Sequence, residues 1–167
     1  MSQLPPSTRR HALRLAGLAL AAVVASCATK PPPVVSNTPA SDQTAGALPL
    51  VNALRAKNGL PPLKIEPTAS AAAIYQARRM ADADKMEHLM GIGDDFGKRV
   101  KASGVKLPAA ENIAEGQRDV NAAVTAWINS PKHLHNMLGK YNGLGVALAY
   151  APTSGGKPYW SMVLSSN

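Results

Sequence analysis

Apolar residues recur at helical spacing in the first part of the chain beyond residue 46. Leu50, Val51 and Leu54 form one stripe, and Asn58-Gly59 is a typical helix stop. A second helix is predicted to begin near Pro67. One of its faces carries mostly small residues: Ala69, Ala73, Ala77, Met80 and Ala81. Small side chains allow another element to pack closely against this helix.

Two further helices are predicted in the middle of the chain. Residues 94–103 form a short helical pattern that ends at Gly104. Asp119 stands where it would cap a fourth helix. The inward-facing residues of that helix share helical spacing: Val120, Val124 and Trp127.

The pattern changes to that of strands near the end of the chain. Residues 144–150 and 159–164 are apolar, strand-like runs, and residues 152–158 between them are rich in Pro, Gly and Ser. We therefore expect an antiparallel hairpin, with a third strand near residues 106–114. Helices followed by a small antiparallel sheet predict an α+β fold. No internal repeat is visible.

The first 27 residues are typical of an export signal. Arg9, Arg10 and Arg14 precede the uncharged, almost wholly apolar stretch Leu15–Ala25. These eleven residues are too few to span a bilayer, which takes about 20. The stretch Val24-Ala25-Ser26-Cys27 resembles a lipobox, in which the Cys becomes the lipidated first residue. The alternative is a cytoplasmic protein with an apolar N-terminal helix.

Cys27 is the only cysteine, so the chain can form no internal disulfide, and its position favours modification by acyl chains such as palmitate. The stretch Thr8–Arg14 partly resembles a twin-arginine signal, which leaves the Sec and Tat routes both open. An Ala directly after the lipidated Cys, as at position 28, is similar to the pattern of lipoproteins sorted to the outer membrane. Location in the inner membrane remains the alternative. We expect residues 28–46 to be a Pro-rich linker and residues 47–167 to form one domain.

Charge excludes one class of partner. Without the three arginines of the signal, 15 Lys and Arg face 10 Asp and Glu, a net charge of +5. The basic residues are scattered and aromatic residues are few, which argues against nucleic acid as a partner. A weak attraction to acidic envelope polymers or lipid headgroups is enough to explain this charge.

Candidate chemistry rests on a few histidines and acids. The sequence has no Gly-rich phosphate loop, no Gly-x-Ser-x-Gly elbow and no His-Glu-x-x-His. What remains is His88 after the second helix, Glu111 in Glu111-Asn112-Ile113, and His133 and His135 in one short stretch. Each of these residues alone has an ordinary structural explanation, such as a surface His or a turn.

Together these residues form a pattern that resembles a bacterial CAP domain, the superfamily of cysteine-rich secretory, antigen-five and pathogenesis-related proteins. The matching motifs run through about 120 residues in order: Asn52-x-x-Arg55, Gly59–Leu63, Ala73, Ala77, Met80, His88, Glu111–Ala114, Trp127, Ser130-Pro131-x-His133, Asn136, Gly143-x-Gly145-Val146 and Tyr159-Trp160. The resemblance implies an α-β-α sandwich with an open cleft.

The resemblance also implies the site residues. His88, Glu111 and His133 take the positions that line the cleft in that family. Eukaryotic members carry a second Glu where this chain has Gly93, and either Asp94 or Asp95 could reach the cleft instead. His135 lies about 200° around a helix from His133, so it should not share the site if this stretch is helical.

Three functions remain open at this stage. The preferred one is a tethered envelope module that binds a lipid, polymer or protein in the cleft and requires no cofactor. We expect it to be a monomer. His88 and His133 could also bind a divalent metal such as zinc weakly, since a catalytic zinc usually has three protein ligands. The alternatives are a hydrolase, either a peptidase or a cell-wall enzyme, that uses His88, Glu111 and His133, and a purely architectural polar cluster.

Overall fold

The computed structural model describes Met1 and residues 37–166. The expectations for the signal, for Cys27 and for most of the linker lie outside the described residues. One compact unit extends from Val34 to Asn167, and both hydrophobic cores lie within it. In the part of the chain that the structure describes, no helix is long and apolar enough to span a membrane.

A five-stranded sheet forms the middle of the domain. Its strands are β1 (Ala40–Asp42), β2 (Lys64–Ile65), β3 (Ala109–Glu115), β4 (Gly143–Ala151) and β5 (Lys157–Ser165). The order is β1-β4-β5-β3, with β2 paired parallel to β4 and all other pairs antiparallel. The predicted hairpin is present as β4 and β5. Strand β3 lies at one edge of the sheet, and this position decides where the cleft forms.

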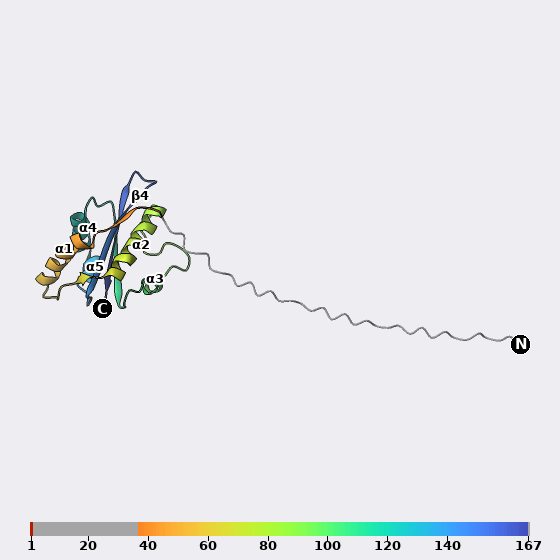
Figure 1. The fold of residues 1–167 in the computed structure, drawn as a ribbon, viewed down its shortest axis with the longest axis horizontal. Helices are drawn as coiled ribbons and strands as arrows, with labels where there is room; N and C mark the ends of the chain where they lie inside the picture. Colours follow the sequence, from red (N-terminus) through yellow and green to blue (C-terminus); the bar gives the residue numbers. More distant parts are fainter. Residues whose placement is uncertain (2–36, 167) are drawn as a thin grey trace. The chain divides into compact units, whose positions relative to one another are not determined.

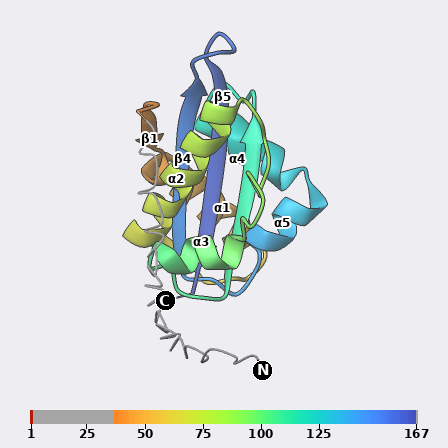
Figure 2. The same ribbon diagram turned by 90° about the vertical axis from the view of Figure 1, so that its right-hand side faces the viewer.

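Helices cover both faces of the sheet (Figures 1 and 2). The helices are α1 (Thr44–Lys57), α2 (Pro67–Ala83), α3 (Phe96–Ala102), α4 (Val120–Ile128) and α5 (Pro131–Met137). One core includes Val51, Trp127 and Met137 on the face of α1, α4 and α5. The other includes Met80 and Val100 on the face of α2 and α3. The α+β fold and the three-layer arrangement predicted from the sequence are confirmed.

Side chains at the helix ends explain where several helices begin and end. Asp119 caps α4 by accepting a hydrogen bond of 2.8 Å from the N–H of Ala122, as the sequence predicted. Asp95 caps α3 in the same way. Helix α2 ends at Asp84, whose carboxylate accepts hydrogen bonds of 2.8 Å from the hydroxyls of Ser154 and Tyr159. The loop after α2 is thereby fixed to the β4–β5 hairpin.

The start of the domain lies earlier than the sequence indicated, so the predicted linker boundary at residue 46 is wrong. Strand β1 pairs with β4, and α1 already begins at Thr44. The Thr44 hydroxyl lies 3.0 Å from the hydroxyl of Ser70 and accepts a hydrogen bond of 2.9 Å from the N–H of Val146. A polar strand of three residues has no pattern of its own, because its pairing comes from β4.

Candidate functional site

An open pocket lies at the free edge of β3, between α5 and the segment that joins α2 to α3. Its volume is about 530 Å³. The residues that line it come from that segment, from β3 and from α5: His88, Glu111, Pro131, Lys132, His133, His135 and Asn136. The structure therefore brings His88, Glu111 and His133, which are far apart in the sequence, to one pocket. We call this pocket the cleft.

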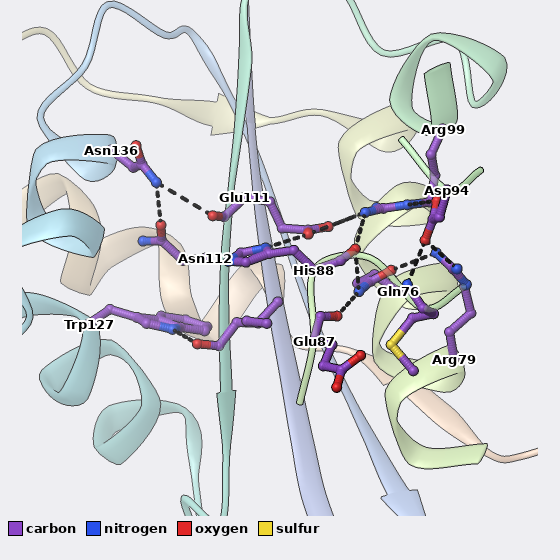
Figure 3. A network of polar contacts seen from close by, with 12 residues as sticks. Gln76, Arg79, Glu87, His88, Asp94, Arg99, Glu111, Asn112, Trp127 and Asn136 are labelled. Carbon is purple, nitrogen blue, oxygen red and sulfur yellow. Dashed lines mark hydrogen bonds and ion pairs between the residues drawn. The ribbon is translucent and has the colours of Figure 1, made fainter. Parts of the chain in front are cut away.

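The Glu111 carboxylate is buried and fully engaged (Figure 3). Its side chain is only 2% exposed. Oε2 accepts a hydrogen bond of 2.8 Å from Nη1 of Arg99, and Oε1 accepts one of 3.3 Å from Nη2. Oε1 also lies 2.9 Å from Nδ1 of His88. An Arg that contacts both carboxylate oxygens forms a strong, directional pair.

The contact with Glu111 fixes the orientation of the His88 ring. A carboxylate that is paired with Arg99 has no proton to donate, so Nδ1 of His88 donates the hydrogen bond. In the neutral ring Nε2 then carries the lone pair, and the His88 side chain is 48% exposed at the cleft. Nη2 of Arg99 also donates to the carbonyl of His88 at 2.9 Å. Arg99 therefore holds both the backbone of His88 and its carboxylate partner.

A second carboxylate lies behind this pair. Asp94 accepts a hydrogen bond from the backbone N–H of Met90 at 2.8 Å and is paired with Arg79, while Arg99 lies 3.8 Å away. Burial opposes ionisation of Asp94, but the Met90 N–H and the two arginines outweigh it and hold its pKa below the usual range. Asp94 thus supports Arg99 from the side opposite to the cleft.

Two asparagines join α5 to β3. Asn112 is completely buried and donates a hydrogen bond of 3.0 Å to the carbonyl of His133. Asn136 donates to the side-chain oxygen of Asn112 at 2.8 Å. These contacts fix the position of His133 relative to Glu111. The Asn of the Glu-Asn-Ile motif therefore serves to position α5.

His133 is half-buried at the cleft. Among the residues that the structure describes, its imidazole has no hydrogen-bond partner. Burial lowers the pKa of His133, and electrostatic interaction with His88, when that ring is protonated, lowers it further. The imidazole of His133 therefore stays neutral to a lower pH than that of an ordinary histidine.

The structure separates the other candidates. Asp95 caps α3 and Asp94 lies behind Arg99, so neither lines the cleft. Gly93 is exposed, with a φ of 80°. His135 lines the rim of the cleft, so the expectation that it cannot share the site is wrong. The cleft extends along α5 from Pro131 to Asn136 and therefore includes residues from more than one side of that helix.

Arg99 and Gln76 are the supporting residues that sequence reasoning missed. Gln76 is fully buried on α2 and donates to the carbonyl of Glu87 at 2.8 Å. Gln76 lies among the small residues on the buried face of α2, and a large polar residue at such a position could have been recognised from the sequence. Arg99 lies beside Val100 on the buried side of α3. A cation at such a position indicates a buried acid as its partner.

Three histidines line the cleft, and the motifs point to two of them, His88 and His133, as metal ligands. In residues 37–166 no group of three or more His, Cys, Asp or Glu side chains is arranged to hold a metal. Glu111 contacts His88 and Arg99, so it would act on a metal only through His88. A metal held by His88 and His133 alone would therefore be one protein ligand short of an ordinary catalytic zinc centre.

Two shallower hollows continue the cleft along β3. One has a volume of about 460 Å³ and shares His88 and His133 with the cleft. The next, of about 230 Å³, is lined by residues that include Trp127 and Ser130. Met86 and Ile113 line both of these hollows. The groove thus changes from basic and polar at the cleft to more apolar beyond it.

The fold and the site define an α-β-α sandwich with a histidine-lined cleft at the edge of its sheet. The family model for CAP, the cysteine-rich secretory protein family, matches residues 48–164. The chain belongs to this family, as its motifs predicted.

Known bacterial proteins share the domain. Protein YkwD of Bacillus subtilis is 37% identical over 90 residues, which is 53% of this chain and 35% of YkwD. An extracellular protein of Bacillus anthracis with an SCP domain has a TM-score of 0.63 at 26% identity, covering 74% of this chain and 40% of that one. The chain thus spans between a third and two-fifths of these relatives.

A third comparison has the same fold over nearly its whole length. An outer surface protein of Borrelia burgdorferi has a TM-score of 0.66 at 19% identity, covering 78% of this chain and 98% of that one. Because the identity is low, this likeness shows the fold alone.

Proposed function

We propose that this protein is an exported, membrane-tethered binding module whose cleft holds a ligand, or weakly a divalent metal, without catalysing a reaction. The observation that carries the proposal is the state of Glu111. Both of its carboxylate oxygens already accept hydrogen bonds, and its side chain is 2% exposed. A general base must reach the proton that it removes, and this carboxylate is turned toward Arg99 and His88.

A hydrolase would have to use His88 instead. Glu111 holds Nδ1, so Nε2 of His88 is the one group of this pair that could activate a water molecule. No Ser, Thr or Cys lines the cleft itself among the described residues. The His88–Glu111 pair supports the hydrolase as the alternative function, so turnover must be assayed directly. The lining of the cleft provides no nucleophilic side chain beside this pair.

Metal binding follows from the two imidazoles. His88 and His133 both line the cleft, and within the described residues the contact with Glu111 leaves Nε2 of His88 unengaged. Neutral imidazoles bind divalent metals, and protons compete for the same nitrogen atoms. We therefore expect zinc affinity to fall as the pH falls through the range in which the histidines protonate. Because the pKa of His133 is lowered, this histidine stays neutral and able to bind metal to a lower pH than an ordinary histidine.

Export and tethering rest on the first 27 residues and on Cys27. The relatives with solved structures include an extracellular protein and an outer surface protein, which supports a place outside the cytoplasm. Acyl chains on Cys27 would anchor the domain to a membrane, and the mass of the mature protein checks this. The ligand would then be a lipid, polymer or protein of the cell envelope.

Zinc binding and turnover test the function together. Residues 34–167, which retain β1, are incubated with envelope fractions with and without zinc, and zinc affinity is measured by calorimetry. His88→Ala and His133→Ala should each weaken zinc binding about tenfold or more, and no zinc-dependent or zinc-independent product should form. His135→Ala is the matched control, because His135 lies at the rim of the same cleft and should leave zinc affinity nearly unchanged.

Two results would count against this proposal. Turnover that disappears in both His88→Ala and His133→Ala, with thermal unfolding unchanged, would establish the hydrolase. Zinc affinity that is equal in the wild type and both variants would remove the metal site.

A further inference from the structure

The backbone of β3 has a fixed orientation at the edge of the sheet. The N–H of Ser166 donates to the carbonyl of Pro108 at 3.1 Å, and the N–H of Gly116 donates to the carbonyl of Pro158 at 2.8 Å. In an antiparallel pair, the peptide groups of alternate residues face the partner strand. Even-numbered residues of β3 therefore face β5, and the N–H and C=O of Glu111 and Ile113 face outward.

Side chains of the flanking helices confirm this direction (Figure 3). Nδ2 of Asn136 donates to the carbonyl of Glu111 at 3.4 Å. Nε1 of Trp127 donates to the carbonyl of Ile113 at 3.0 Å. Both outward carbonyls of this part of the edge are therefore already used by the protein itself.

The N–H groups of the same two residues are not used in this way. They face outward with their carbonyls, and neither has a hydrogen-bond acceptor within residues 37–166. Glu111 lines the cleft, and Ile113 lines the hollow that shares His88 and His133 with it. The edge of β3 thus offers donors without acceptors beside the cleft.

This asymmetry selects the kind of ligand. A peptide that adds to a sheet edge exchanges hydrogen bonds in both directions. At this edge its N–H groups would meet carbonyls that Asn136 and Trp127 already occupy. A group that only accepts hydrogen bonds needs no free carbonyl at the edge, so it leaves no N–H donor of its own unpaired. Carboxylate and phosphate oxygens are acceptors of this kind.

Charge around the cleft favours the same ligand. Lys132 brings a positive charge to it, its three histidines bring no negative charge, and Glu111 is the one acid among its lining residues. The Glu111 carboxylate is paired with Arg99 through two contacts, so its charge is balanced inside the protein. Glu87 and Glu115 do not line the cleft itself, and each lines an adjoining hollow together with Ile113.

We propose that the cleft and the adjoining hollow that shares His88 and His133 form one anion site, in which the N–H groups of Glu111 and Ile113 and the ammonium group of Lys132 receive carboxylate or phosphate oxygens. The proposal rests on the binding function above and names its ligand class. Two N–H groups that lie two residues apart on one strand edge are separated by about 7 Å. A ligand with several anionic groups, such as a segment of an acidic polymer, should therefore bind more tightly than a single anion.

Amide NMR of ¹⁵N-labelled residues 34–167 tests the site. Sulfate, tripolyphosphate and phosphatidylglycerol vesicles are titrated separately in metal-free buffer, with phosphatidylcholine vesicles as the uncharged surface. The amide signals of Glu111 and Ile113 should shift with sulfate and saturate at a lower concentration of tripolyphosphate. Comparison of the vesicle titration with the titrations of soluble anions shows whether the ligand is a lipid headgroup or a soluble anion. In either case the amide signals of Glu111 and Ile113 must shift.

Lys132→Ala should weaken binding of tripolyphosphate about tenfold, as expected for loss of a charged hydrogen bond. Lys140→Ala removes the same charge from an exposed position outside the cleft and should leave affinity unchanged. Amide signals of Glu111 and Ile113 that do not respond, or equal losses in both variants, would overturn the anion site. If the anion site fails in this way but zinc still binds, the proposed binding function stands without it. If anions bind but zinc does not, only the proposed metal site is ruled out.

Discussion

Replacing Arg99 with Ala should lower the free energy of unfolding by about 3–5 kcal/mol, as is usual when one partner of a buried ion pair is removed. Arg99 has an exposed side-chain fraction of only 6%, and Glu111 of 2%. Without the guanidinium, the Glu111 carboxylate would stay buried with only His88 as its partner. The carbonyl of His88 would also lose the shorter of its two hydrogen bonds and keep only the one from Gln76. Urea unfolding of residues 34–167 measures the change.

A surface ion pair gives the matched control for Arg99. Arg118 lies 3.2 Å from Asp119, but its side chain is 90% exposed. Arg118→Ala should therefore change the free energy of unfolding by less than about 1 kcal/mol. An Arg99→Ala variant as stable as Arg118→Ala would contradict the buried pair on which the position of His88 depends. The double variant Arg99→Met with Glu111→Gln should recover part of the lost stability, because it leaves no uncompensated charge.

Replacing Gly145 with Ala should also destabilise the domain strongly. A Cβ atom at Gly145 would lie 2.1 Å from the carbonyl carbon of Ala69 and 2.2 Å from the backbone nitrogen of Ser70. These are backbone atoms of α2, which cannot turn aside as a side chain would. Overpacking a core usually costs about 1–3 kcal/mol, and we expect the upper end or more here. Helix α2 carries Gln76 and leads to His88, so the cleft should be disturbed as well.

Gly91 provides the control for this substitution. It lies in the same segment as His88, and a Cβ there would meet nothing within 4 Å. Gly91→Ala should change the free energy of unfolding by no more than about 0.5 kcal/mol. Thermal unfolding compares the two variants. If Gly145→Ala unfolds at the same temperature as Gly91→Ala, α2 does not pack against β4 as closely as described.

Elements with a strong local signal could be predicted from the sequence. The small residues of α2, the cap at Asp119 and the apolar runs of β4 and β5 each appear where the pattern placed them. Strands β1 and β2 were missed, since they have three and two residues and depend on β4 for their pairing. Local periodicity cannot indicate a strand whose stability comes from a distant partner.

The site was predictable as a set of residues but not as a network. The family motifs pointed to His88, Glu111 and His133, and the structure places all three at one cleft. The role of Arg99 depends on the approach of α3 to β3, which no spacing in the sequence reveals. Other motif residues prove to be anchors. Asn52 exchanges two hydrogen bonds with the backbone of Leu63, and the buried Arg55 donates to four carbonyls.

The protonation pattern of the His88 ring tests whether Glu111 is engaged by His88, as the binding function requires, or is free to act as a general base, as a hydrolase could require. Long-range ¹H–¹⁵N NMR spectra near neutral pH report which ring nitrogen carries the proton. We expect His88 to carry it on Nδ1, with Nε2 unprotonated, and Glu111→Ala to abolish this preference while His135 stays unchanged. A His88 ring protonated on Nε2, or one that Glu111→Ala does not affect, would show that Glu111 is not engaged as described and would contradict the proposed function.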